Sequence, residues 1–298
     1  MQFFAPSAST ERPRGPEDTW AWAPWVIGVL IVASIAIASV VGVSRTLEAV
    51  GMGVADAALT MVVVSPLLVL ALRGRSGAAR ALVVLFLLIV CSRWALGLPR
   101  VGAFAALDWN WQGKTLELVW LAVLFAVLWR WARDEAGLGW GIRRGSGRQL
   151  ASVIVGVFLI SGALSLWAFA DADAAHVLPS IERVLFDATH ANLTEELLVR
   201  GAMLAVLDRV CGTPWRFFGA QVGWGLILTT VWFGLWHGLI FTPDGLMFDP
   251  GAIIATGIAG LLLGWIRARS GSVWLAYVAH CAPELGASAG QFVWALSA

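Results

Sequence analysis

Long apolar runs dominate this sequence and constrain its fold more than any other feature. A helix needs about 20 apolar residues to cross the bilayer core. Because lipid offers an exposed backbone no hydrogen-bond partners, such spans must be helical. We therefore expect an all-α, polytopic transmembrane helix bundle of about eight or nine spans. The candidate spans cover about residues 21–44, 52–72, 79–98, 116–132, 150–170, 181–208, 220–241, 250–266 and 272–296.

Composition supports a membrane protein and argues against other classes. Apolar residues make up 59% of the chain and charged residues only 13%, with a mean hydropathy of +0.80. In soluble domains, about 45–50% of residues are apolar and about 25% are charged. A net charge of +1 provides no basic face for nucleic acid. Cys91, Cys211 and Cys281 are too widely spaced for a disulfide framework or a zinc knuckle, so we expect them to be small core residues.

The chain divides into three predicted regions. Residues 1–19 are polar and rich in proline, which predicts a disordered cytoplasmic tail. Residues 20–149 supply the N-terminal transmembrane helices, and residues 150–298 form the bundle that carries the candidate site.

The distribution of basic residues predicts an orientation. Under the nine-span topology, 14 of the 20 Lys and Arg residues lie in the tail and in loops on the same side of the membrane, and four lie on the other side. Cytoplasmic loops carry the excess of Lys and Arg. We therefore expect an integral protein of a bacterial inner membrane, with a cytoplasmic N-terminus and its C-terminus outside.

Three pairs of glycines four residues apart predict close helix packing in the last third of the chain. This small-xxx-small spacing lets helix backbones approach each other. The pairs are Gly219 with Gly223, Gly234 with Gly238, and Gly260 with Gly264.

The sixth span contains two adjacent carboxylates and an arginine. Each ionisable group near the bilayer centre costs roughly 2.5 to 3.5 kcal/mol, so such groups indicate a functional site. Glu196 and Arg200 are four residues apart and share a helix face, where they can form an ion pair. Glu195 is rotated about 100° from its neighbour. We expect it to face a different partner.

Two later spans add further polar groups: the seventh contains His237, and the ninth contains His280 and Glu284. His280 and Glu284 are four residues apart and share a helix face, and Pro283 between them predicts a kink. Six polar groups at about 3 kcal/mol each approach 18 kcal/mol before pairing. That cost favours a catalytic or transport site over helix packing alone. The six candidate site residues are Glu195, Glu196, Arg200, His237, His280 and Glu284.

The order and spacing of these residues resemble a known family. The Glu195-Glu196-xxx-Arg200 motif, then Phe233-xxx-His237, then His280-xxx-Glu284, look like the CPBP family of intramembrane proteases over about residues 150–296. This family includes type II CAAX prenyl endopeptidases and bacteriocin-processing and self-immunity proteins.

The resemblance implies an intramembrane endopeptidase with a cavity inside the membrane. Glu195 would be the general base that activates a water with His237, and His280 would help to hold the oxyanion. Glu196 and Arg200 would support them. The substrate would be a membrane-associated protein or peptide. Glu284 stands where the family usually has Asn, which puts an oxyanion role for this position in doubt, since an ionised Glu cannot donate a hydrogen bond.

The residues themselves are compatible with this chemistry. Peptide hydrolysis needs water, a base and donors for the developing negative charge. No Ser has an obvious partner base, and Cys281 and His280 point about 100° apart on a helix, so the sequence shows no covalent nucleophile.

The sequence leaves alternatives open for both the cofactor and the class of function. Glu195, His237 and His280 are a suitable zinc set, but no HExxH pairing is present. We favour a site with no cofactor, in which Glu195 is the base. A proton-coupled transporter remains an alternative, although we find no polar residues in the first five spans to match the site. The other alternative is a catalytically silent immunity or scaffold protein.

Overall fold

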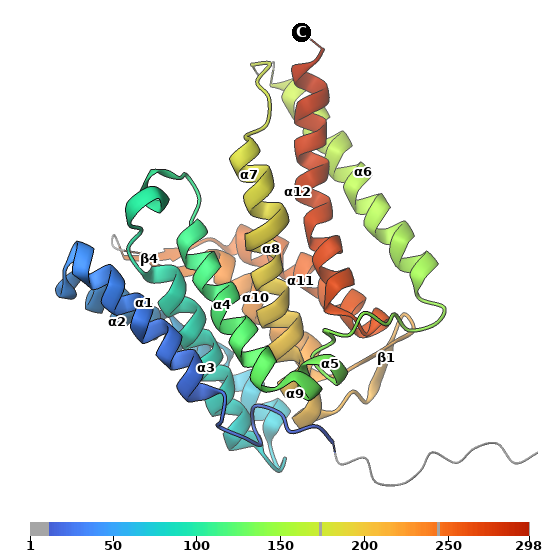
Figure 1. Ribbon diagram of the computed structural model, residues 1–298. Helices are drawn as coiled ribbons and strands as arrows, with labels where there is room; N and C mark the ends of the chain where they lie inside the picture. The colour runs from blue at the N-terminus through green and yellow to red at the C-terminus, as the bar shows by residue number, and fades with distance from the viewer. Residues whose placement is uncertain (1–11, 173–174, 243–244, 298) are drawn as a thin grey trace, which may run out of the picture.

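The computed structural model describes residues 12–172, 175–242 and 245–297 as a bundle of helices with two short hairpins (Figure 1). Within these residues, each of the nine expected spans corresponds to a helical segment. The predicted all-α membrane bundle is therefore confirmed. The first half of the chain contains α1 (Ala23–Val41), α2 (Val43–Leu72), α3 (Ala78–Gly97), η1 (Gly102–Ala106), α4 (Trp111–Val127), α5 (Trp129–Asp134) and α6 (Gly147–Asp171).

The second half contains the elements that carry the predicted site. They are α7 (Ile181–Phe186), η2 (Asp187–Ala191), α8 (Asn192–Glu195), η3 (Glu196–Met203), α9 (Leu204–Cys211), β1 (Trp215–Phe217), β2 (Ala220–Val222), α10 (Trp224–Gly238), β3 (Leu239–Thr242), β4 (Gly245–Phe248), α11 (Pro250–Ser270) and α12 (Val273–Ala295).

Five of the described helices are long and apolar enough to cross a membrane by length and composition: α1, α2, α3, α6 and α11. The others are shorter or carry polar residues. α4 contains Lys114 and Glu117, and α12 contains His280 and Glu284. Both of these helices contribute polar side chains to the interior.

The sixth predicted span is one continuous helical segment from Ile181 to Cys211, but its winding is irregular. Asp187–Ala191 and Glu196–Met203 are π-helical, and the single α-helical turn Asn192–Glu195 lies between them. π-helical turns inside α-helices occur frequently at functional sites. The irregular winding therefore coincides with the two adjacent glutamates.

The seventh predicted span is shorter than expected. Its ends were wrong, because 220–222 and 239–241 lie in β-strands, and the helix covers only Trp224–Gly238. Antiparallel hairpins flank this helix, β1 with β2 on one side and β3 with β4 on the other. Gly219 turns the first hairpin with φ of 79°, so its predicted role in a helix seam was also wrong.

Close approach of glycine backbones fixes two helix pairs. A Cβ on Gly234 would lie 2.6 Å from the carbonyl oxygen of Ile253, which confirms a seam between α10 and α11. α6 and α12 run side by side in Figure 1. There, a Cβ on Gly290 would lie 2.2 Å from the carbonyl oxygen of Gly162. These helices therefore pack at backbone contact.

The N-terminal segment differs in part from the predicted disordered tail. Residues 1–11 lie outside the described residues. Residues 13–19 are folded against the bundle because Arg209, at the end of α9, collects partners from them. Its guanidinium forms ion pairs with Glu17 at 2.5 Å and with Asp18, and it donates to the carbonyl of Pro13 at 2.7 Å. The described residues 13–19 therefore have specific contacts with α9.

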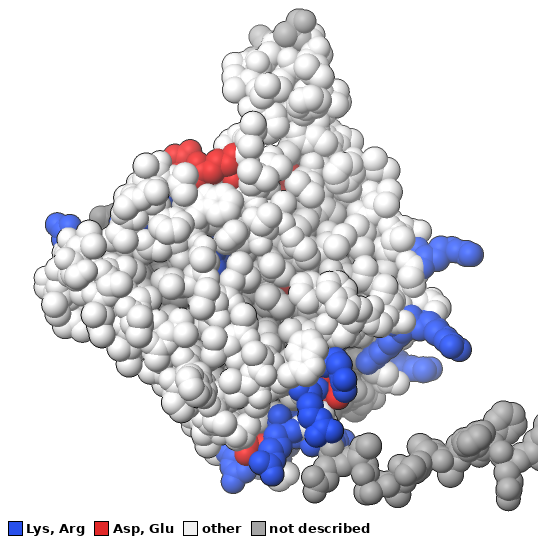
Figure 2. Space-filling model, in the orientation of Figure 1, with Lys and Arg blue, Asp and Glu red and all other residues white. Residues whose placement is uncertain are grey.

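Charged side chains are confined to parts of the surface. Figure 2 shows most of the visible Lys and Arg along the lower and right edges of the view and an acidic patch at the upper left, while most of the remaining face is uncharged. The exposed apolar side chains include Val32, Val62 and Trp167, each more than 60% exposed. A broad uncharged face with exposed apolar side chains suits contact with lipid.

Candidate active site

The deepest part of the site is a cluster around Glu196. Arg200 Nη1 donates to Glu196 Oε1 at 2.7 Å, which is the predicted pair on one helix face. His280 Nδ1, from α12, lies 2.9 Å from the same oxygen. Glu196 and Arg200 are fully buried, and Arg200 also donates to the carbonyl of Gly260 at 3.2 Å. These contacts join η3, α11 and α12.

Glu195 faces away from this cluster, as its position on the helix predicts. Its Oε1 accepts a hydrogen bond from Lys114 Nζ, on α4, at 3.1 Å. Its Oε2 lies 3.8 Å from His237 Nε2, at the end of α10. The side chain is 22% exposed, whereas that of Glu196 is 0% exposed. Of the two carboxylates, Glu195 is the accessible one.

The hydrogen bonding of His237 assigns its tautomer. His237 Nδ1 lies 2.7 Å from the carbonyl oxygen of Phe233, which can only accept, so Nδ1 carries the proton. In the neutral ring, Nε2 is then an acceptor that faces Glu195 Oε2, which is also an acceptor. Two acceptors at 3.8 Å do not bond each other, but both can accept from one water at about 2.8 Å.

Phe233 lies between the two parts of the site. Its ring centroid is 4.6 Å from that of His237 and 5.6 Å from that of His280. The Arg200 guanidinium lies over the same ring at 4.1 Å. This residue therefore fixes both histidines relative to the buried arginine.

Glu284 lies one helical turn beyond His280 and has a partner of its own. Asn192 Nδ2 donates to Glu284 Oε2, and it also lies 3.6 Å from the Sγ atom of Cys281. Asn192 precedes Glu195 by three residues. The structure thus brings all six predicted site residues into one region, with Glu284 at its edge.

The sequence analysis missed the partner of Glu195. Lys114 lies between the third and fourth predicted spans in sequence, but it is on α4, only 8% exposed, and it bridges Glu195 to Glu117 at 3.2 Å. Ser92 on α3 donates to Glu117. A charged residue in a predicted loop does not indicate a buried ion pair. The i, i+3 spacing of Lys114 and Glu117, however, indicated that the two could pair on a helix.

The sequence analysis found no polar residues in the first five spans to match the site, but polar side chains of these spans form buried contacts. Arg93 on α3 pairs with Asp56 on α2 at 2.7 Å, and its guanidinium lies 5.0 Å from the ring centroid of Trp236 on α10. The N-terminal helices therefore carry two buried ion-pair groups, and one of them reaches the predicted base.

The sequence left open a zinc set of Glu195, His237 and His280. In the part of the chain that the structure describes, no three His, Cys, Asp or Glu side chains converge as metal ligands would. Lys114 contacts Glu195 Oε1, and Glu196 contacts His280 Nδ1. The first contact occupies one oxygen of Glu195, and the second leaves Nε2 of His280 available.

An apolar cavity of about 370 Å³ lies beside the site, between α6, η2 and α12. Its lining includes Tyr277 and Cys281, which flank His280 on α12, and Phe158 on α6. The hydroxyl of Tyr277 donates to the carbonyl of Ala188 and ties α12 to η2.

The fold and the site define a class: an integral membrane helix bundle with a buried acid-base centre on three of its helices. Residues 178–285 match the family model described as type II CAAX prenyl endopeptidase Rce1-like. This match covers all six predicted site residues and supports the resemblance to this protease family over that part of the chain. Neither the curated proteins nor the solved structures yielded a match.

Proposed function

We propose that this protein is an intramembrane endopeptidase in which Glu195 and His237 activate a water molecule. One observation carries the proposal: Glu195 Oε2 and His237 Nε2 are both acceptors and lie 3.8 Å apart. A water that donates one hydrogen to each is polarised and held in place. General bases of this kind contribute about 10²- to 10⁴-fold to rate.

In the proposed reaction, Glu195 removes a proton from the water and the oxygen attacks the scissile carbonyl carbon. The tetrahedral intermediate then collapses, and Glu195 returns the proton to the departing amine. The products are one carboxylate and one amine, with one water consumed. Lys114 acts as a positioning residue, because its contact with Oε1 leaves Oε2 directed at His237.

The oxyanion requires a donor, and His280 is the candidate. Its Nδ1 contacts Glu196, and no described residue hydrogen-bonds to its Nε2. In the imidazolium form both ring nitrogens are donors, so Nε2 can donate to the oxyanion while Glu196 holds Nδ1. Glu196 and Arg200 then act by fixing the orientation of this ring.

The apolar cavity supports a membrane-associated substrate. It adjoins α12 at Tyr277 and Cys281, next to His280, and its lining is almost wholly hydrophobic. An apolar segment of a membrane peptide, or a lipid attached to one, suits such a surface. The name of the family model refers to prenylated CAAX proteins, which makes lipid-modified peptides the first class to test.

We further propose that the protein lies in a bacterial inner membrane with its N-terminus in the cytoplasm. The basic edges of the molecule support this orientation (Figure 2), because cytoplasmic ends carry the excess of arginine.

The test is cleavage of a membrane-peptide library, containing lipid-modified and unmodified members, by the purified full chain. Glu195→Ala and His280→Ala should both abolish cleavage, and a zinc chelator should leave wild-type cleavage intact. Activity lost to the chelator and restored by zinc would recast Glu195, His237 and His280 as ligands. A folded wild type that cleaves nothing would favour a transporter or a silent scaffold.

A further inference from the structure

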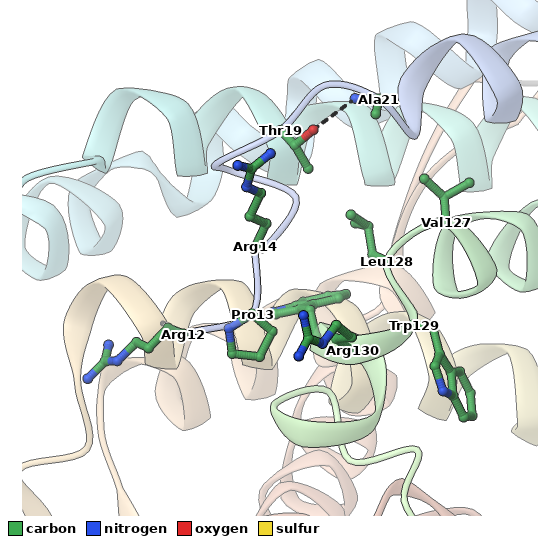
Figure 3. Close-up of a pocket in the computed structure, with 10 residues that line it drawn as sticks. Arg12, Pro13, Arg14, Thr19, Ala21, Val127, Leu128, Trp129 and Arg130 are labelled. Carbon is green, nitrogen blue, oxygen red and sulfur yellow. Dashed lines mark hydrogen bonds between the residues drawn. The ribbon is translucent and has the colours of Figure 1, made fainter. Parts of the chain in front are cut away.

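A basic cavity lies at the end of the bundle where the N-terminal segment meets the turn between α4 and α5 (Figure 3). Its volume is about 480 Å³, within the usual range of about 300–1,000 Å³ for small-molecule sites. Its lining residues all precede the active-site glutamates in the sequence, and none of the proposed catalytic residues is among them.

Three arginines line this cavity: Arg12 and Arg14 on the N-terminal segment, and Arg130 on α5. All three are exposed. Guanidinium groups present several N–H donors in a planar fork that suits phosphate. The chemistry of the lining therefore favours an anion with phosphate oxygens.

The nearby acids form their ion pairs with other arginines. Glu17, Asp18 and Glu135 pair with Arg209, and Asp134 pairs with Arg133 at 2.7 Å. In the described part of the chain, no acidic side chain pairs with Arg12, Arg14 or Arg130. The same Arg209 contacts pin the N-terminal segment to the bundle and so preserve the wall of the cavity.

The remaining lining indicates a lipid rather than a soluble anion. Val127 is 41% exposed and Trp129 is 54% exposed, and both line the cavity with Leu128. α1 begins at Ala23 and α4 ends at Val127, so the cavity lies where apolar spans give way to polar segments. Tryptophan is enriched at that depth of a bilayer.

We propose that this cavity binds the phosphodiester headgroup of an anionic phospholipid, with Arg14 and Arg130 as its principal contacts and the acyl chains lying against Val127 and Trp129. Basic pockets of this kind beside membrane helices recognise anionic lipids. The proposal is independent of the peptidase function.

The test counts phosphatidylglycerol and phosphatidylcholine bound to the full chain in a neutral detergent, by native mass spectrometry. The wild type should prefer phosphatidylglycerol. Each arginine near a membrane surface is worth about fivefold in affinity, so Arg14→Gln with Arg130→Gln should weaken phosphatidylglycerol binding about 25-fold. Arg14→Lys with Arg130→Lys keeps the charge and should recover most of the affinity.

The matched control is Arg73→Gln with Arg80→Gln, which removes the same charge from exposed positions at the end of α2 and in the first turn of α3. This control should bind phosphatidylglycerol like the wild type. Equal losses in both double variants would indicate general attraction and overturn the site. A wild type without lipid preference, or one in which inorganic phosphate displaces phosphatidylglycerol at equal concentration, would overturn the lipid assignment.

Discussion

At the scale of single residues, two adjacent carboxylates acquire different roles because the helix turns them in different directions. Glu196 is fully buried and its Oε1 contacts both Arg200 and His280. Glu195 is partly exposed and contacts Lys114 with one oxygen. Glu196 therefore has a structural role, whereas Glu195 has a second oxygen that can accept a hydrogen bond from water.

Lys114 provides the first prediction. Replacing it by Met leaves Glu117 and Glu195 buried without their shared cation, and breaking a buried pair in this way costs about 3–5 kcal/mol. Lys114→Met should therefore lower the thermal unfolding midpoint and the cleavage rate together. Both follow from loss of the contacts at 3.1 Å and 3.2 Å.

A second variant separates stability from positioning. Lys114→Met combined with Glu117→Gln removes one of the two unpaired carboxylates, so it should regain part of the lost unfolding midpoint without regaining the cleavage rate. Recovery of full cleavage in the double variant would show that Lys114 does not position Glu195.

Asn192 gives a prediction about Glu284. Its Nδ2 group is the donor to the Glu284 carboxyl, and leaving a buried polar group without its partner costs about 1–3 kcal/mol. Asn192→Leu should destabilise the fold by that amount in denaturant unfolding. In an Asn192→Leu, Glu284→Leu double variant the cost should shrink, because the orphaned carboxyl is gone. Additive losses would contradict the contact.

At the scale of helices and hairpins, regular features of the sequence made it possible to predict the helical spans and one ion pair. The spacing of Glu196 and Arg200 by one helical turn predicted their ion pair, and apolar length predicted the order of the spans. The ends of α10 were not predictable from hydropathy, because β-strands such as Leu239–Thr242 are as apolar as the helix. Its start at Trp224 brings His237 to the level of Glu195.

Contacts between distant helices were harder to anticipate. Lys114 and Glu195 are 81 residues apart in the chain, and no local pattern links them. The glycine seam of α12 was likewise overlooked, although Gly286 and Gly290 have the spacing that identified other seams. Sequence periodicity assigns a face to a residue but does not say which helix covers that face.

The seam between α6 and α12 offers a prediction with an internal control. Gly290→Ala places a Cβ 2.2 Å from a backbone oxygen, which cannot move like a flexible side chain. Overpacking of this kind typically costs about 1–3 kcal/mol, so the unfolding midpoint should fall. Gly156→Ala on α6, with nothing within 4 Å of the new Cβ, should be neutral or stabilising by about 0.5–1 kcal/mol. Equal effects would contradict the packing.

At the scale of the whole molecule, the distribution of charge relates the bundle to the membrane. Because cytoplasmic ends carry the excess of arginine, the basic edges in Figure 2 lead us to expect the loop between α5 and α6 in the cytoplasm and the loop between α6 and α7 outside.

Cysteine labelling tests this orientation, since all three native cysteines are buried. An impermeant maleimide should label Leu178→Cys on intact cells, because this residue is 57% exposed on the outer loop. Arg144→Cys, exposed on the other loop, should be labelled only after permeabilisation. The reverse pattern would invert the topology.

The central claim is that Glu195 is the base that activates water, and the most direct measurement is the cleavage rate of Glu195→Gln. This variant keeps the shape of the side chain and removes its basicity. Glu48→Gln, an exposed position on α2, is the matched control. We predict a loss of about 10²- to 10⁴-fold for Glu195→Gln and no change for Glu48→Gln, with both variants folded. A folded Glu195→Gln protein that cleaves at the wild-type rate would contradict the account.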